Sequence, residues 1–275
     1  MGSISAGWGE SLVWDDQQNR LYFVDCLTST LHWLDQGDIE PHGFVLPSMP
    51  TGVVLTTTGD LVVVLDDGLY TCEPDDRTLD LLTRYPAGFE GRCNDASADL
   101  SGNIVTGKLN MGPAEGSSWQ FSFSRGWTLL DPEISNTNGP AALDIDGRST
   151  LIVGDTSAQY FAYDYDAEAA TVGPRQVFGD TTDLAGHPDG TTVDAEGGLW
   201  CALVGGGQLA RYTPDGLDST VEVPATNPTD VTFGGAGLDH LYITTIGGDA
   251  EMDGALLVIT GLEQTGRPEP RAHVN

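Results

Sequence analysis

The sequence predicts an all-β fold, namely a six-bladed β-propeller with a central channel. A unit of apolar strand, polar turn and apolar strand recurs six times in the 275 residues. The second strands of these units open about 40 to 48 residues apart, which is the length of one four-stranded blade. No segment longer than ten residues has the 3.6-residue apolar period of a helix. The residues that open the second strands are Leu21, Leu61, Ile104, Leu151, Leu199 and Leu241.

Six hairpins supply the two inner strands of each expected blade. In chain order they read SLVWDDQQNRLYFVD, TGVVLTTTGDLVVVLD, NDASADLSGNIVTGKL, GPAALDIDGRSTLIVGD, GTTVDAEGGLWCALV and TDVTFGGAGLDHLYITTI. Each is rich in β-branched and aromatic residues around a turn containing Gly, Asp or Asn. Third strands are expected at GLYTCEP, YFAYDYD, QLARYTPDG and ALLVIT, and outer strands at DLLTRY, PRQVF and STVEVP.

A β-sandwich or two separate β domains are the alternative architectures. Six hairpins at a single period favour a propeller, in which the innermost strands converge on the channel. No Pro/Ser-rich linker divides the chain, so we expect one domain over residues 1–275. The last segment, residues 263–275, has an irregular composition and is expected to be an exposed tail.

The charge balance excludes some classes of partner. The chain has 41 acidic and 11 basic residues, a net charge of −30, which would repel nucleic acid and anionic membrane surfaces. The acidic residues are scattered, which favours a solubility surface, such as one adapted to high salt, over a field that concentrates cations. No apolar run approaches the roughly 20 residues that span a bilayer.

Four cysteines lie far apart with no CxxC pair, which argues against a structural zinc site. The first residues show no signal-peptide pattern. We therefore expect free, buried thiols and a cytoplasmic protein. A monomer or a weak dimer is the expected oligomeric state.

Polar residues open most of the innermost strands, where a propeller places them at the mouth of its channel. Turn chemistry explains Asn138 before Gly139 or Asp189 before Gly190 one at a time. It does not explain Glu10, and it does not explain why the polar residues all fall at the same position within the repeat. In chain order the set is Glu10; Arg92, Asn94 and Asp95; Asn136 and Asn138; Asp189; Asn227 and Asp230. The second repeat offers only the poor ligands Met49, Pro50 and Thr51.

Carboxylates and amides that converge in a channel would repel one another without a cation. Such oxygen donors suit a hard divalent ion, namely Ca²⁺, Mg²⁺ or Mn²⁺. With few protein ligands, the ion could polarise a carbonyl or phosphoryl oxygen and lower the pKa of a bound water, while a nearby carboxylate acts as general base. His187 is expected to be a loop or rim residue.

These residues resemble the regucalcin/gluconolactonase family, also called senescence marker protein. The resemblance extends over most of residues 8–245 through the ordered segments GESLVWDDQQNRLYFVD, GRCNDASADLSGNIVTG, SNTNGPAALDIDGRSTLIVGDT, HPDGTTVDAEGGLWCALVGGGQLARYTPDG and NPTDVTFGGAGLDHLYITT. It implies a six-bladed propeller that hydrolyses sugar lactones with one divalent metal ion. Calcium is the first expectation for that ion, and Zn, Mn, Mg and Fe are the alternatives.

The resemblance also implies roles for individual residues. Glu10, Asn138 and Asp189 match metal ligands, and Asp189 also matches the catalytic base. Arg92 and Asn94 match residues that contact the substrate. The expected activity is therefore a metal-dependent lactonase that acts on a small lactone or ester. A phosphotriester or fluorophosphate hydrolase using the same site is one alternative, and a calcium- or ligand-binding propeller without catalysis is another.

The chain departs from the family pattern in three places. It reads GESL where the family reads GEGP. Few residues precede Glu10, so we expect closure of the ring to rest mostly on the C-terminal blade. The segment from Leu109 to Trp119 is compact, which leaves substrate preference open. Tryptophans near the mouth could line an apolar pocket, although core packing is their more common fate. These tryptophans are Trp8, Trp14, Trp119 and Trp127.

Overall fold

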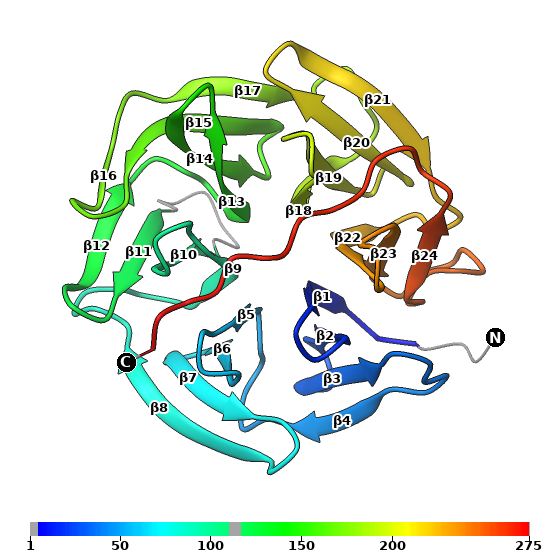
Figure 1. The fold of residues 1–275 in the computed structure, drawn as a ribbon, viewed down its shortest axis with the longest axis horizontal. Helices are drawn as coiled ribbons and strands as arrows, with labels where there is room; N and C mark the ends of the chain where they lie inside the picture. Colours follow the sequence, from blue (N-terminus) through cyan, green and yellow to red (C-terminus); the bar gives the residue numbers. More distant parts are fainter. Residues whose placement is uncertain (1–4, 110–116, 275) are drawn as a thin grey trace.

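Six antiparallel sheets surround a central axis in the computed structural model, which describes residues 5–109 and 117–274 (Figure 1). The prediction of an all-β, six-bladed propeller is confirmed. Within those two ranges every regular element is a strand. Strands follow one another from the axis outward in each blade, so that the first strand of each blade lines the channel.

The first three blades each contain four strands. The first consists of β1 (Gly9–Asp15), β2 (Arg20–Asp25), β3 (Thr30–Asp35) and β4 (His42–Val45). The second consists of β5 (Gly52–Leu55), β6 (Leu61–Leu65), β7 (Gly68–Glu73) and β8 (Thr78–Arg84). The third consists of β9 (Cys93–Ala98), β10 (Ile104–Lys108), β11 (Ser118–Ser122) and β12 (Gly126–Asp131).

The last three blades vary at their outer edges. The fourth consists of β13 (Thr137–Ile145), β14 (Arg148–Asp155) and β15 (Gln159–Asp166), whose outer edge pairs with β16 (Thr171–Val172) and β17 (Gln176–Asp180). The fifth consists of β18 (His187–Val193), β19 (Leu199–Val204), β20 (Gln208–Thr213) and β21 (Gly216–Glu222). The sixth consists of β22 (Pro228–Gly234), β23 (His240–Thr245) and β24 (Leu257–Thr260).

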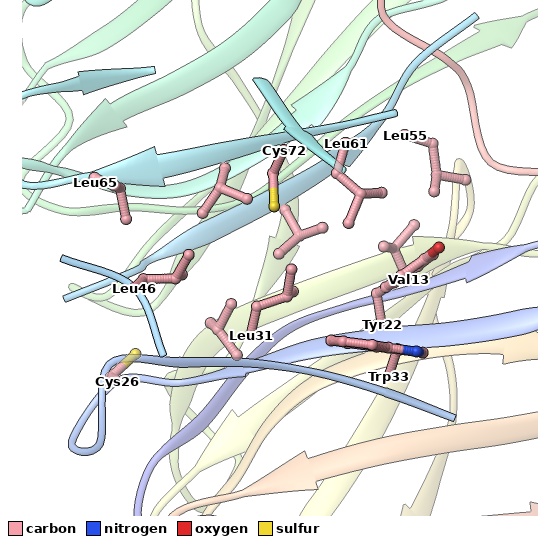
Figure 2. Packing of buried hydrophobic residues seen from close by; sticks show 13 residues of the cluster. Val13, Tyr22, Cys26, Leu31, Trp33, Leu46, Leu55, Leu61, Leu65 and Cys72 are labelled. Carbon is pink, nitrogen blue, oxygen red and sulfur yellow. The ribbon is translucent and has the colours of Figure 1, made fainter. Parts of the chain in front are cut away.

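The hydrophobic core lies between neighbouring blades. Inner strands such as β6 and β19 are packed on both faces, which explains why LVVVL and LWCALV are almost continuous apolar runs. Figure 2 shows the cluster between the first two blades, where Leu31 and Trp33 of β3 face Leu61 of β6 and Cys72 of β7. All four cysteines are free and buried in such clusters, as the sequence predicted.

The ring closes through residues from both ends of the chain. Ser5 pairs with Ala255, and the Ala6 N–H donates to the Gly254 carbonyl oxygen over 2.7 Å. At the axis, the N–H of Leu12 in β1 donates to a carboxylate oxygen of Asp230 in β22 over 2.6 Å. The expectation that closure would rest mostly on the C-terminal blade is therefore too narrow, because the short N-terminal segment bonds directly across the seam.

The C-terminal tail crosses the propeller, as the red trace in Figure 1 shows. Gly266 pairs with Asp194 after β18, and Ala272 pairs with Thr56 after β5. Ala272 is fully buried, so the prediction of an exposed tail is wrong for this residue. The tail makes isolated bridges rather than a regular strand. Its partners follow the ends of the innermost strands, so the tail covers the end of the channel opposite the strand starts.

Candidate functional site

The predicted site residues meet where the innermost strands begin. The side-chain amide of Asn94 in β9 donates to Oδ1 of Asn138 in β13. The amide of Asn138 donates in turn to the carbonyl oxygen of Pro188, the residue before Asp189 in β18, over 3.0 Å. Glu10 in β1 lies close enough to Asp189 for their charges to interact. The structure therefore brings together Glu10, Asn94, Asn138 and Asp189.

A bulge accompanies each of these residues. The pairing register shifts between Glu10 and Val13, between Asn138 and Ala141, and between Pro188 and Thr191. It also shifts between Cys93 and Ala96, the two residues on either side of Asn94 and Asp95 that pair with β10. Bulges re-aim side chains and are frequent beside functional sites. The second blade pairs β5 with β6 without any shift, and this is the blade whose sequence offers only poor ligands.

Asp189 lies inside strand β18, not in a free turn before it. Its N–H donates to the phenol oxygen of Tyr160 over 3.1 Å. Gly190 is required next to it, because a Cβ atom there would come within 2.0 Å of Oδ1 of Asp230. Turn chemistry was one explanation for Asp189 before Gly190 in the sequence. In the structure, the glycine is instead needed because two channel strands pack closely at this point.

Four carboxyl groups share the channel: Glu10, Asp95, Asp189 and Asp230. Burial raises the pKa of the Glu10 carboxyl to about 8, and the charge of Asp95 adds to this effect. Burial also raises the pKa of Asp95 to about 6. The pKa values of Asp189 and Asp230 are raised well above the usual range by burial and then by the other carboxylates. Each carboxylate therefore disfavours ionisation of the others.

Asp95 and Asp230 also connect neighbouring blades. Asp95 accepts a hydrogen bond from the N–H of Gly139 over 2.8 Å, and Asp230 accepts one from Leu12 over 2.6 Å. Sequence reasoning placed both aspartates at the channel mouth but gave them no role. Their shared phase with Glu10 and Asp189 was the available signal, and the backbone partners were not visible in the sequence.

A small hollow opens beside these groups. Arg92 lies in its wall, 3.6 Å from a carboxylate oxygen of Asp66 and in contact with the sulfur of Met49. The guanidinium brings a positive charge to a wall that otherwise carries carboxylates. The described residues that line the hollow are Trp8, Glu10, Cys26, Met49, Thr51, Arg92, Asn94, Asp95 and Leu109.

Other predicted mouth residues play smaller parts. His187 is exposed at the first position of β18, consistent with a rim residue. Of the four tryptophans considered, Trp8 lines the hollow. Trp14 is buried in the core, Trp127 packs on Phe121, and the indole of Trp119 donates to Ser117. The compact segment predicted between Leu109 and Trp119 falls mostly on residues 110–116, outside the described residues.

The donor set fits a hard divalent cation. Glu10 and Asp189 offer carboxylate oxygens, and both amide hydrogens of Asn138 are engaged by Pro188 and by Thr156, 2.9 Å away. This arrangement directs the Asn138 Oδ1 toward Asn94 and the channel. Oxygen donors of this kind suit Ca²⁺, Mg²⁺ or Mn²⁺, and a cation would relieve the repulsion among the buried carboxylates.

A second group of metal-type donors lies on the outer strands of the first blade. Ligand atoms of Asp35, Asp38 and His42 lie within 4.8 Å of one another. Asp35 already forms an ion pair with Arg20 over 2.7 Å, and the other two side chains are exposed. This group lacks the burial and mutual repulsion of the channel carboxylates.

The fold and the oxygen donors at its channel mouth define a lactonase-like six-bladed propeller. A family model described as the SMP-30/gluconolactonase/LRE-like region matches residues 8–247. The chain belongs to this family, as the sequence resemblance indicated.

Individual relatives agree with this assignment. Pentonolactonase XacC of Haloferax volcanii is 30% identical, over 97% of this chain and 94% of that protein. The 6-deoxy-6-sulfogluconolactonase of Pseudomonas putida is 30% identical, over 86% of this chain and 82% of that protein. The crystal structure of regucalcin from Agrobacterium tumefaciens, described as a calcium-binding protein, superposes with a TM-score of 0.86 at 25% identity, covering 98% of this chain and 97% of that one. The relatives named lactonases support a hydrolase.

Among residues 5–109 and 117–274, no helix has the length and apolar character needed to traverse a bilayer.

Proposed function

We propose that this protein is a metal-dependent lactonase that hydrolyses a small lactone at the mouth of its channel. The convergence of Glu10, Asn138 and Asp189, with charge repulsion between the buried carboxylates of Glu10 and Asp189, is the observation that carries the proposal. Relatives named pentonolactonase and 6-deoxy-6-sulfogluconolactonase support a sugar-derived lactone as substrate. A relative described as calcium-binding supports calcium as the first candidate ion.

Glu10, Asn138 and Asp189 would hold the ion through their oxygen atoms. A bound divalent cation would supply Lewis-acid polarisation of the lactone carbonyl and a lower pKa for a nearby water. The positive charge would also favour the ionised form of Asp189, whose pKa is raised by burial and by Glu10 in the channel.

Asp189 is the proposed general base. Its carboxylate takes a proton from water as the water oxygen bonds to the lactone carbonyl carbon. The ring ester C–O bond then breaks, and the departing alkoxide oxygen takes the proton back from Asp189. The product is the open-chain hydroxy acid, and no covalent intermediate with the protein is required.

Arg92 and Asn94 are the proposed substrate contacts. Both amide hydrogens of Asn94 are used within the protein, on the Thr137 carbonyl oxygen at 2.9 Å and on Asn138. The Asn94 carbonyl oxygen therefore serves as an acceptor for a substrate hydroxyl. Arg92 complements it as a donor, so the pair can orient a polyhydroxylated ring.

The test combines metal content with turnover. We would measure bound metals by mass spectrometry, and hydrolysis of gluconolactone, a pentonolactone, dihydrocoumarin and a phosphotriester by a pH indicator, before and after chelation. One bound divalent ion, with lactone hydrolysis lost on chelation and restored on re-addition, is the expected result. Faster turnover of the phosphotriester would favour the alternative hydrolase. Bound metal with no turnover would favour a binding protein.

The cellular setting is part of the same proposal. Free thiols persist in reducing compartments, and all four cysteines are free and buried. We therefore place the activity in the cytoplasm.

A further inference from the structure

Trp8 forms a hydrogen bond with a proposed metal ligand. Its indole N–H donates to Oε1 of Glu10 over 2.7 Å. Trp8 directly precedes β1, Glu10 is the second residue of that strand, and both residues line the hollow. A carboxylate oxygen that accepts such a bond is held in one orientation and is less available to other partners.

The backbone of Trp8 is itself held from two blades. Its N–H donates to Oδ1 of Asp25 over 3.2 Å, and its carbonyl oxygen accepts from the N–H of Cys26 over 2.9 Å. On the other side Trp8 pairs with Ile246 of the sixth blade. The indole is therefore fixed at the seam where the ring closes, and it is a rigid support for the Glu10 side chain.

The backbone at this point deviates from a regular strand. Ser11, the residue after Glu10, has a φ of 51°, and the register of β1 shifts between Glu10 and Val13. The backbone alone therefore does not aim Glu10 as a flat strand would, and the long Glu side chain retains several rotatable bonds. The Trp8 indole restricts these rotations.

We propose that Trp8 is a positioning residue that holds the Glu10 carboxylate in the orientation needed to bind a divalent cation. The proposal rests on the proposed function, in which Glu10 is a cation ligand. Residues that orient metal ligands from outside the coordination sphere typically change metal affinity by about 10–100-fold when they are removed.

The first test measures calcium binding by calorimetry on metal-free, full-length protein. Trp8→Phe keeps an aromatic ring and removes the N–H donor. Trp200→Phe is the matched control, because the Trp200 indole donates to a carboxylate oxygen of Asp194 over 3.0 Å and neither residue lines the hollow. We expect calcium affinity to fall about tenfold or more in Trp8→Phe and to stay within about twofold of wild type in Trp200→Phe.

The outcomes of the calorimetry are distinct. Wild-type affinity in a folded Trp8→Phe variant would overturn the positioning role while leaving the metal site standing. An equal loss in Trp200→Phe would also overturn it, because the effect would then reflect general destabilisation. Absence of binding of calcium, manganese, magnesium, zinc and ferrous iron to the wild type would instead overturn the proposed function.

A second test follows the Trp8 side chain itself by NMR in proteins that keep this tryptophan. The indole N–H of Trp8 gives its own signal in a ¹H–¹⁵N spectrum, assigned by its absence from the spectrum of Trp8→Phe. We expect this signal to shift in Glu10→Gln and again when calcium is added to wild type, while the Trp200 indole signal stays in place. A Trp8 signal that moves in neither case would contradict the proposal.

Discussion

The N–H of Asp189 donates to the phenol oxygen of Tyr160, 3.1 Å away, and that phenol also lies 3.2 Å from the Asp189 carbonyl oxygen. Tyr160 is fully buried in β15, so the backbone of the proposed base is fixed from a neighbouring blade. The position of the Asp189 backbone therefore does not depend on the side-chain charge, and we expect the charge to be removable without moving the strand.

Asp189→Asn should abolish most of the lactonase activity and leave the fold intact. The substitution keeps the size of the side chain but removes the proton acceptor, and such a loss typically costs about 10²–10⁴-fold in rate. The measurement is kcat/KM on the best lactone, with thermal unfolding of the same samples. Asp215→Asn, at an exposed turn, is the control and should retain wild-type activity. An active Asp189→Asn enzyme with bound metal would show that another group is the base.

Calcium should stabilise the protein more at pH 8.5 than at pH 6. Protons and a cation compete for the same carboxylates, and the raised pKa values of Asp95 (about 6) and Glu10 (about 8) keep protons bound over this range. Because these folded-state pKa values lie above the unfolded ones, the stability that these two groups contribute to the metal-free protein is present at low pH and is lost as pH rises through them. A divalent cation replaces the lost protons.

The expected size follows from ligand linkage. Calcium at about 100 times its Kd contributes about 2.7 kcal/mol, which corresponds to a rise in Tm of about 5–10 °C. Scanning calorimetry with calcium or with chelator, at both pH values, makes the measurement. A calcium-induced shift that is larger at pH 6, or equal at both, would place the ion away from these carboxylates.

Much of the fold could be predicted from the sequence because propeller blades repeat. The opening residues Leu61, Ile104 and Leu199 begin β6, β10 and β19 as expected, whereas Leu21 and Leu151 lie inside strands that begin with arginine. Strand existence follows from local apolar runs, but strand ends depend on pairing with the neighbouring strand, which a single segment does not reveal.

The site was only partly accessible to sequence reasoning. The shared position within the repeat marked a larger set of polar residues at the channel mouth, and the resemblance to the regucalcin/gluconolactonase family then singled out Glu10, Asn138 and Asp189. The bonds from Leu12 to Asp230 and from Trp8 to Glu10 could not be predicted. Both cross or support the seam of the ring, and their geometry depends on how bulged strands from distant parts of the chain meet.

The tail was mispredicted for a related reason. Its composition, EQTGRPEPRAHVN, is that of an exposed segment, yet Gly266 and Ala272 are buried and pair with residues that follow the inner strands. Proline and glycine prevent a regular strand but do not prevent single backbone bonds to other blades. Local composition therefore predicted the irregular backbone of the tail correctly, but it did not predict that the tail would pair with other blades.

Deletion of residues 264–275 should destabilise the propeller. The deletion removes backbone bonds from Ala272 to Leu55 and from His273 to Gly102, of 2.7 and 2.8 Å, and uncovers one end of the channel. Each kcal/mol lost lowers Tm by about 2–4 °C in a domain of this size class. Calorimetry should show a clear fall in Tm. An unchanged Tm would show that the tail is not part of the stable structure.

Glu269→Gln should gain stability relative to wild type as pH rises. Oε1 of Glu269 accepts from the hydroxyls of Thr192 at 2.9 Å and Thr232 at 3.3 Å, and a glutamine oxygen can keep both bonds. Burial raises the pKa of the Glu269 carboxyl, so the stability linked to its bound proton is present at low pH and is lost as pH rises through that pKa.

The measurement is the difference in Tm between Glu269→Gln and wild type at pH 4.5 and pH 8. We expect the difference to become more positive at pH 8. Glu263→Gln, at an exposed position of the same tail, should show no such change with pH. A difference independent of pH in Glu269→Gln would mean that Glu269 is paired well enough to remain ionised without cost.

Monovalent salt should raise the stability of the whole molecule. The net charge of −30 produces self-repulsion in the compact state, and screening shortens its range from about 10 Å at 0.1 M salt to about 3 Å at 1 M. We expect Tm to rise by a few degrees between these concentrations of KCl, with chelator present so that divalent ions do not contribute. Choline chloride should act similarly if screening is the cause. A rise with KCl but not with choline chloride would instead indicate specific binding of potassium. A fall in Tm would show that attractive ion pairs outweigh the repulsion; one such pair joins buried Arg211 to Asp194 over 2.7 Å.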